Sequence, residues 1–357
     1  MVSAVALVVA GACRSAVAPS DSPTPDHSAS PPSSSPSAAA FQKGISYAGW
    51  YRGAYSSADS DRSLADLAAT GATWISLIVT GYQETAASTS ITIDSSQTPS
   101  DGDLAHAIAT AHSLGLKVML KPHVDLSADD AHWAGSIGSA FTTEAQWQAW
   151  FDAYRAFIDH YARLAQNDGV DQFCIGTELV GVSGRSADWR NVAAGVRAGF
   201  HGPITYASNH DGEESSIDWW DAVDYIGVDA YYILSDTTDP TEAQLQAAWT
   251  DRGYVARLAG LSARFRRPVL LTEIGYGSMD GTTTEPWQWD VSSTLDLQEQ
   301  ADAYQAALSA LYGQPWLAGM FWWTWDTDPN KGGPSSISFT PHGKPAETVL
   351  RSFYSRP

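Results

Sequence analysis

The segment PVLLTEIGY, residues 268–276, is a continuous apolar run of strand length with a glutamate near its carboxyl end. A strand has this composition when both of its faces are buried, as in the helix-covered parallel sheets of α/β proteins. Seven similar segments occur from Gly44 onward, and longer amphipathic segments separate them. Eight is the number of βα units that closes a barrel, so we expect an α/β protein with a single-domain (β/α)8 TIM barrel. The expected strands are residues 44–50, 73–80, 117–126, 172–179, 203–209, 225–232, 268–276 and 317–326.

The segments between these strands carry helix signals. Glycines at 71 and 115 should each occupy the left-handed position that follows the end of a helix. A longer helix should begin after Thr143, with the carboxylate of Glu144 in its first turn. Large apolar residues recur in it at intervals of three and four, so we expect them to pack against the strands instead of binding a ligand. These residues are Trp147, Trp150, Phe151, Tyr154, Phe157, Ile158 and Tyr161.

The composition limits the possible partners. The 357 residues include 20 Lys and Arg against 40 Asp and Glu, and the resulting formal charge of −20 opposes binding to nucleic acid. Two cysteines, Cys13 and Cys174, cannot supply a Cys-ligated metal site, and Cys174 lies in an apolar strand. We expect neither a metal nor a cofactor. The 15 tryptophans exceed ordinary packing needs and favour a ligand that stacks on aromatic rings.

The amino-terminal segment has the character of an export signal. Residues 1–13, MVSAVALVVAGAC, are apolar but too short to span the roughly 30 Å hydrocarbon core of a bilayer. The ending AGAC resembles the lipobox of bacterial lipoproteins, which implies lipidation of Cys13. The alternative is an ordinary signal peptide that is cleaved near Ala18. The first interpretation predicts a cell-surface lipoprotein that touches the membrane only through its lipid, and the second predicts a secreted extracellular protein.

The next segment separates this signal from the fold. Residues 14–40 are rich in Ser, Pro and Ala, and such a composition buries too little apolar surface to fold. We expect a disordered linker there and the barrel at residues 41–357. The sequence gives no indication of the oligomeric state.

Two glutamates stand at matching positions of the expected barrel. Glu178 follows the fourth apolar run and Glu273 follows the seventh. Active sites of such barrels form at the carboxyl ends of the strands, and strands four and seven face one another there. A buried carboxylate is costly without partners, so a pair at these positions indicates a function. Carboxylates about 5 to 5.5 Å apart suit a retaining glycosidase, in which one is the nucleophile and the other the acid/base.

The chain resembles clan A retaining glycoside hydrolases, and most closely glycoside hydrolase family 113, whose members include β-mannanases. The resemblance rests on three motifs: IGTEL at 175–179, LLTEIGY at 270–276 and FWWTWD at 321–326. It implies that Glu178 is the general acid/base and Glu273 the nucleophile. It also implies a polysaccharide or oligosaccharide substrate, with β-1,4-mannan preferred.

The resemblance has two further implications for individual residues. Most members of the clan carry Asn immediately before the acid/base, where it holds the sugar 2-hydroxyl, but this chain has Thr177 there. A tyrosine after strand six should donate its hydroxyl to the nucleophile. In the motif VDAYY, strand alternation from Asp229 selects Tyr231 as the inward-pointing tyrosine. We count Thr177, Asp229 and Tyr231 among the expected substrate-binding residues.

Other polar residues near the expected barrel mouth are candidates for sugar contacts. Lys121, His123 and Asp125 alternate along strand three and should therefore point to one face. A role in metal binding is the alternative for His123, but only Asp125 lies at a suitable spacing, so we favour hydrogen bonds to sugar. Asn209 and His210 follow strand five, where each is either a mouth residue or part of a turn.

Aromatic residues complete the expected site. Trp322 and Trp323 end strand eight and are candidates for a platform beneath the sugar, because an aromatic face packs well against pyranose C–H groups. Strand alternation predicts that at least one tryptophan of this motif belongs to the core. Trp50 follows strand one, and Trp287 with Trp289 lies in a polar loop after strand seven that should extend the cleft.

We therefore expect a retaining glycoside hydrolase that acts on a β-linked polysaccharide, with β-1,4-mannan as its substrate. Two alternatives remain open at this point. The same mechanism could act on β-glucan, xylan or galactan, because no single residue identifies mannose. A non-catalytic lipoprotein that captures sugars on a barrel scaffold would share most of these features.

Overall fold

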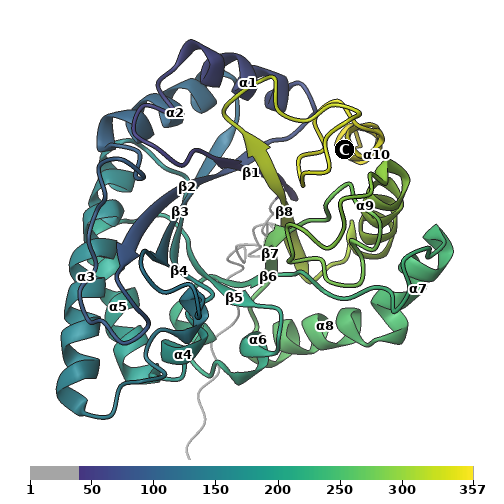
Figure 1. The fold of residues 1–357 in the computed structure, drawn as a ribbon. Coiled ribbons are helices and arrows are strands. Elements are labelled where there is room, and N and C mark those ends of the chain that lie inside the picture. Colours follow the sequence, from purple (N-terminus) through teal and green to yellow (C-terminus); the bar gives the residue numbers. More distant parts are fainter. Residues whose placement is uncertain (1–39, 357) are drawn as a thin grey trace, which may run out of the picture. The chain divides into compact units, whose positions relative to one another are not determined.

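The computed structural model describes residues 40–356, and eight parallel strands close into a barrel in the order β1 to β8 (Figure 1). The (β/α)8 prediction is therefore confirmed. The predicted signal segment at residues 1–13, the lipidation of Cys13 and nearly all of the linker at 14–40 lie outside the described residues. The strands are β1 Gln42–Ala48, β2 Trp74–Gln83, β3 Lys117–Leu126, β4 Gln172–Thr177, β5 Ile204–Asn209, β6 Tyr225–Asp229, β7 Val269–Ile274 and β8 Leu317–Asp326.

Helices surround the barrel on its outer side (Figure 1). None of the helices in residues 40–356 has the length and apolar character needed to cross a membrane. The α-helices are α1 Ala58–Ala68, α2 Asp101–Ser113, α3 Glu144–Asn167, α4 Val180–Ser183, α5 Ser186–Gly199, α6 Glu213–Ser216, α7 Glu242–Asp251, α8 Tyr254–Phe265, α9 Leu297–Leu311 and α10 Pro345–Tyr354. Two short 3₁₀ helices, η1 Ala134–Ser136 and η2 Trp220–Ala222, lie in the connections.

Two of the three helix ends predicted from the sequence are confirmed. Thr143 caps the amino end of α3 in a capping box with Gln146, which satisfies amide groups that the helix leaves free. Gly115 follows the carboxyl end of α2 with a φ of 78°, as predicted. Gly71 also has a positive φ, but it lies one residue farther from α1 than predicted because that helix already ends at Ala68.

The core lies in two layers. Inside the barrel, Trp74, Met119, Leu270 and Phe321 pack together beneath the mouth. Between strands and helices, a larger cluster includes Trp189, which stacks on Trp219 with ring centroids 5.2 Å apart. Many of the tryptophans therefore pack in the core. The expectation that the tryptophan excess as a whole serves a stacking ligand is wrong. The tryptophans without appreciable exposure are Trp150, Trp189, Trp219, Trp220, Trp249, Trp322 and Trp325.

Several strands end earlier than the apolar runs predict. Strands β3 and β8 have the predicted bounds, whereas β4 stops at Thr177, β6 at Asp229 and β7 at Ile274. Immediately after β4, Glu178 adopts a left-handed backbone conformation with a φ of 51°, which ends the strand. The polar residues that close these apolar runs thus belong partly to loops at the carboxyl end of the barrel.

Candidate active site

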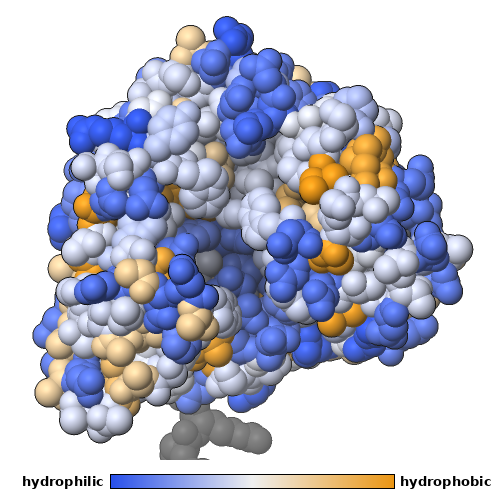
Figure 2. Space-filling view, viewed as in Figure 1, coloured by the Kyte–Doolittle hydropathy of each residue, from blue (hydrophilic) through white to orange (hydrophobic). Residues whose placement is uncertain are grey.

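A cavity of about 640 Å³ opens at the carboxyl ends of the strands. The space-filling view shows a hollow at the centre of this face, with mainly hydrophilic residues around it (Figure 2). Its size is within the usual range for small-molecule sites. The lining residues are Trp50, Thr80, His123, Val124, Asp125, Trp133, Ala134, Thr177, Glu178, Asn209, His210, Asp211, Tyr231, Glu273, Trp287, Trp289, Trp323 and Phe339.

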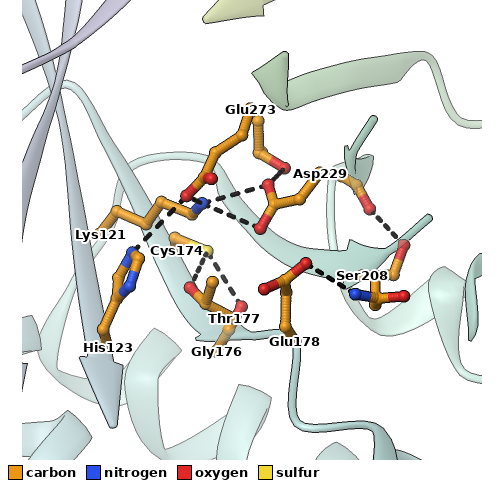
Figure 3. A network of polar contacts seen from close by, with 12 residues as sticks. Lys121, His123, Cys174, Gly176, Thr177, Glu178, Ser208, Asp229 and Glu273 are labelled. Atoms are coloured by element: carbon orange, nitrogen blue, oxygen red, sulfur yellow. Dashed lines mark hydrogen bonds and ion pairs between the residues drawn. The ribbon is translucent and has the colours of Figure 1, made fainter. Parts of the chain in front are cut away.

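Glu178 and Glu273 both line this cavity, as predicted from their positions after the fourth and seventh apolar runs. Glu273 is the fifth residue of β7, and Glu178 directly follows β4. Their side chains approach the same space from opposite sides (Figure 3). The negative charge of Glu273 contributes to the raised pKa of Glu178.

Two donors hold the carboxylate of Glu273. The hydroxyl of Tyr231 donates to Oε2 over 2.6 Å, and the ammonium of Lys121 donates to Oε1 over 2.5 Å. Nε2 of His123 lies 3.9 Å from Oε1 (Figure 3). Burial raises the pKa of Tyr231, and the charge of Glu273 raises it further, so the hydroxyl keeps its proton and remains a donor. The tyrosine selected by strand alternation is therefore the one that contacts Glu273.

Lys121 and Asp229 lie beneath the cavity instead of lining it. Both side chains are inaccessible, and Nζ of Lys121 contacts both carboxylate oxygens of Asp229 at 3.1 Å. Thr272 donates to the same carboxylate over 2.7 Å. The prediction that Lys121 and Asp229 contact sugar is thus wrong for this structure. Alternation gave the correct face of each strand, but both residues lie one layer too deep to touch a ligand.

The ionisation of this buried pair follows from its surroundings. Burial alone would lower the pKa of Lys121, but the carboxylates of Asp229 and Glu273 raise it above its usual value. Burial and the neighbouring Glu273 raise the pKa of Asp229 to about 7, although Lys121 and Thr272 oppose the rise. The lysine therefore remains a cation, and it supplies the positive charge that an ionised Glu273 requires in this enclosed place.

Glu178 has a different environment. Burial is the main cause that raises its pKa well above the usual value, and the charges of Asp229 and Glu273 add to the effect. Its Oε1 accepts a 2.8 Å hydrogen bond from Nδ2 of Asn209. The amide of Asn209 is oriented for this contact, because its Oδ1 accepts from the backbone N–H of Asp211. Asn209 is accordingly a mouth residue, and its bond to Asp211 also makes it part of the turn after β5, so both interpretations of this residue apply.

The two glutamates are therefore arranged for different chemical roles. Glu273 accepts hydrogen bonds from a hydroxyl and an ammonium, which hold its carboxylate in one position, as a nucleophile requires. Glu178 is held toward its protonated form, as a general acid requires. Two carboxyl groups in such contrasting environments on one cavity suit the roles of an acid and a nucleophile in glycosidic bond cleavage.

One tryptophan of strand β8 faces the cavity and its neighbour does not. Trp323 lines the cavity, with Trp50 and Trp289 at centroid distances of 6.1 and 6.4 Å from its ring. Trp322 is fully buried and stacks on Tyr304 of α9 at 3.7 Å. The prediction that Trp322 contacts sugar is therefore wrong, because this side chain points outward to the helix layer. The peptide bond after Trp323 is cis.

The other predicted residues lie at the cavity wall. His123, Asp125, Thr177 and His210 all line it. Burial and the charge of Lys121 lower the pKa of His123 well below its usual value, so its imidazole is neutral. Partial burial lowers the pKa of His210, and its ring stacks on Trp287 at 4.9 Å.

Sequence reasoning missed several lining residues. Trp133 lies in the loop after β3, just before η1, and Phe339 lies between β8 and α10. Asp211 and Thr80 also line the cavity. Loop residues carry no periodic signal, so only the exposed character of Trp133 beside polar neighbours could have indicated it. Thr80 stands near the carboxyl end of β2, where its position alone would have been a usable signal.

Comparisons with known proteins agree with this geometry. A family model described as Glycoside Hydrolase Family 113 matches residues 46–344. Among solved structures, a GH113 β-mannanase, AaManA from Alicyclobacillus acidocaldarius in complex with ManMIm, is 31% identical with a TM-score of 0.79. That match covers 88% of this chain and 97% of the mannanase. No curated protein sequence matched the chain.

Two further structures illustrate the range of similarity. A complex of a GH113 β-1,4-mannanase is 28% identical, has a TM-score of 0.78, and the match covers 89% of this chain and all of that one. A β-D-glucuronidase from Dictyoglomus thermophilum is 14% identical with a TM-score of 0.56. It is matched over 89% of this chain and 51% of the glucuronidase, and at that identity it shows only the shared barrel fold.

Proposed function

The chain belongs to glycoside hydrolase family 113, and on that premise we propose that it is a retaining glycosidase that cleaves β-1,4-linked mannan. The observation that carries the proposal is the contrast between two glutamates on one cavity. Glu273 receives a hydroxyl and an ammonium, and the pKa of Glu178 is raised by burial. One carboxyl group is thus prepared as a nucleophile and the other as an acid.

The proposed reaction has two steps. Glu273 attacks the anomeric carbon while Glu178 protonates the departing glycosidic oxygen, which leaves a glycosyl-enzyme ester. Ester formation removes the negative charge of Glu273, and with it one of the charges that raises the pKa of Glu178. Glu178, now ionised, then accepts a proton from the water that hydrolyses the ester. The configuration at the anomeric carbon is the same before and after the two displacements.

The substrate proposal rests on the mannanase relatives and on the charge of the cavity. Solved relatives that cover almost the whole domain are described as β-mannanases. Among the described residues that line the cavity, none is Lys or Arg, whereas Asp125 and Asp211 add negative charge. A neutral sugar suits this wall better than an anionic one. Trp323 provides the aromatic face on which a pyranose would rest.

Purified protein assayed in parallel on mannan, glucomannan, β-glucan, xylan and galactan tests the substrate proposal. We expect the highest kcat/KM on mannan or glucomannan. A clear preference for one of the other polymers would replace mannan and leave the mechanism in place. Binding of manno-oligosaccharides without cleavage by the wild-type protein would instead support the non-catalytic alternative, in which affinity survives Glu273→Gln.

A further inference from the structure

A third glutamate, Glu213, lies behind the candidate acid/base and makes no contribution to the reaction described so far. It is the first residue of the short helix α6, and only 4% of its surface is exposed. Oε2 accepts a 2.6 Å hydrogen bond from the backbone N–H of Asn209, and Oε1 accepts a 2.7 Å bond from the hydroxyl of Tyr206. One carboxylate therefore joins two points of strand β5.

Both of these partners lead to Glu178. Asn209 donates its side-chain amide to Oε1 of Glu178 over 2.8 Å. The hydroxyl of Tyr206 accepts a 2.9 Å bond from the backbone N–H of Leu179, the residue that follows Glu178. The carboxylate of Glu213 is thus linked through Asn209 to the side chain of Glu178, and through Tyr206 to the peptide group that follows Glu178.

The backbone of Glu178 needs this support. Its φ of 51° is a conformation that side chains other than glycine adopt reluctantly, so neighbouring contacts must maintain it. The N–H of Glu178 is bound by the carbonyl of Ala207, and the N–H of Leu179 by Tyr206. Both acceptors lie on β5, the strand that Glu213 also contacts.

Hydrogen bonds to Glu213 oppose the effect of burial on the pKa of its carboxyl group. Burial raises the pKa of Glu213 to about 7, whereas the bonds from Asn209 and Tyr206, and the hydroxyl of Ser183 on α4, lower it. An apolar residue would avoid the cost of burying a carboxyl group, so its presence behind a reacting group indicates a function.

We propose that Glu213 is a positioning residue for the acid/base: through Asn209 and Tyr206 it holds the carboxyl group of Glu178 at the glycosidic oxygen. This proposal rests on the proposed function, in which Glu178 donates a proton to the leaving group. Its consequence is specific. Loss of Glu213 should impair proton donation more than it impairs substrate binding or nucleophilic attack.

The variant Glu213→Gln tests the proposal, because its amide can no longer accept hydrogen bonds at both ends. The readout is kcat/KM on two substrates: an aryl β-mannoside with a good leaving group, which departs without a proton, and an unactivated manno-oligosaccharide. We expect a loss of about 10- to 100-fold on the oligosaccharide, which is part of the roughly 100- to 10,000-fold that a general acid contributes, and a loss of less than about threefold on the aryl mannoside.

The neighbouring Glu214 supplies a matched control. Its side chain is fully buried on the same helix, but its carboxylate lies 3.0 Å from Nε of Arg257 instead of contacting Asn209 or Tyr206. Glu214→Gln should leave the ratio of the two kcat/KM values unchanged. If Glu213→Gln fails to fold, Tyr206→Phe carries the test, since it removes a single oxygen and should give the same leaving-group dependence.

Equal losses on both substrates in the folded variant would overturn the positioning role. The variant Glu178→Ala separates this outcome from failure of the proposed function. If the loss of kcat/KM in Glu178→Ala depends on the leaving group and the loss in Glu213→Gln does not, only the positioning role is wrong. If Glu178→Ala shows no such dependence, the acid/base assignment itself is wrong.

Discussion

The ammonium of Lys121 lies 2.5 Å from Oε1 of Glu273, and no part of the lysine side chain is exposed. The same ammonium contacts Asp229 at 3.1 Å. A single buried cation thus forms ion pairs with two carboxylates, one of which belongs to the candidate nucleophile. This relationship connects the stability of the barrel interior to the chemistry of the cavity above it.

Lys121→Met should therefore lower stability and activity together. Without the cation, Asp229 and Glu273 would face one another unpaired, and removing one partner of a buried ion pair costs about 3 to 5 kcal/mol. Urea denaturation should show a loss of this size. The double variant Lys121→Met with Asp229→Asn should regain much of the stability without regaining activity. Wild-type stability in the single variant would contradict the pairing.

Glu273→Ala should reduce kcat by at least about a thousandfold, as expected for loss of a nucleophile. Added azide should then restore turnover of an aryl β-mannoside with a good leaving group, because the shortened side chain leaves room for the anion. The glycosyl azide formed should have inverted configuration. Glu178→Ala is the matched control, in which azide should give a product of retained configuration. Glu273→Ala with undiminished activity would exclude this residue as the nucleophile.

Asn209→Ala should move the alkaline limb of the pH profile of kcat/KM. Glu178 acts in its protonated form, so activity falls as the pH rises through its pKa. The hydrogen bond from Asn209 lowers that pKa, so its removal should raise the pKa and shift the limb to higher pH. One hydrogen bond corresponds to a shift of about half to one pH unit. Thr177→Val, a change on the same wall, should leave the limb in place; a shift to lower pH in Asn209→Ala would contradict the assignment.

The neighbouring tryptophans of β8 should respond differently to replacement. Trp323→Ala removes a cavity wall and should reduce kcat/KM strongly, with a smaller loss of folding free energy than Trp322→Ala because part of the Trp323 ring borders the cavity. Trp322→Ala removes a fully buried side chain that stacks on Tyr304, and should cost about 3 to 5 kcal/mol of folding free energy. Thermal unfolding and kinetics on both variants distinguish these effects. Equal stability of the two variants would contradict the placement of Trp322.

The sequence predicts the barrel and its glutamate pair well because both leave local signals. Apolar runs with both faces buried identify the strands, and a carboxylate at the end of such a run is unusual. Strand β3 was predicted with its observed bounds. The end of β4 was not, because the left-handed backbone of Glu178 is imposed by contacts to β5 that no local pattern reveals.

The sequence does not predict how deep in the barrel a side chain lies. Alternation places Lys121 and His123 on one face of β3, but only the closed barrel shows that Lys121 is buried beneath the cavity while His123 lines it. Alternation along β8 likewise puts Trp322 and Trp323 on opposite faces, but only the closed barrel shows that Trp323 lines the cavity while Trp322 packs on Tyr304.

The configuration of the first product tests the central claim most directly. Proton NMR can follow the anomer that wild-type protein releases from a manno-oligosaccharide, before mutarotation mixes the two forms. Double displacement at Glu273 with Glu178 as acid/base predicts that the β-anomer appears first. Initial release of the α-anomer would contradict a covalent intermediate, and with it the roles assigned to both glutamates.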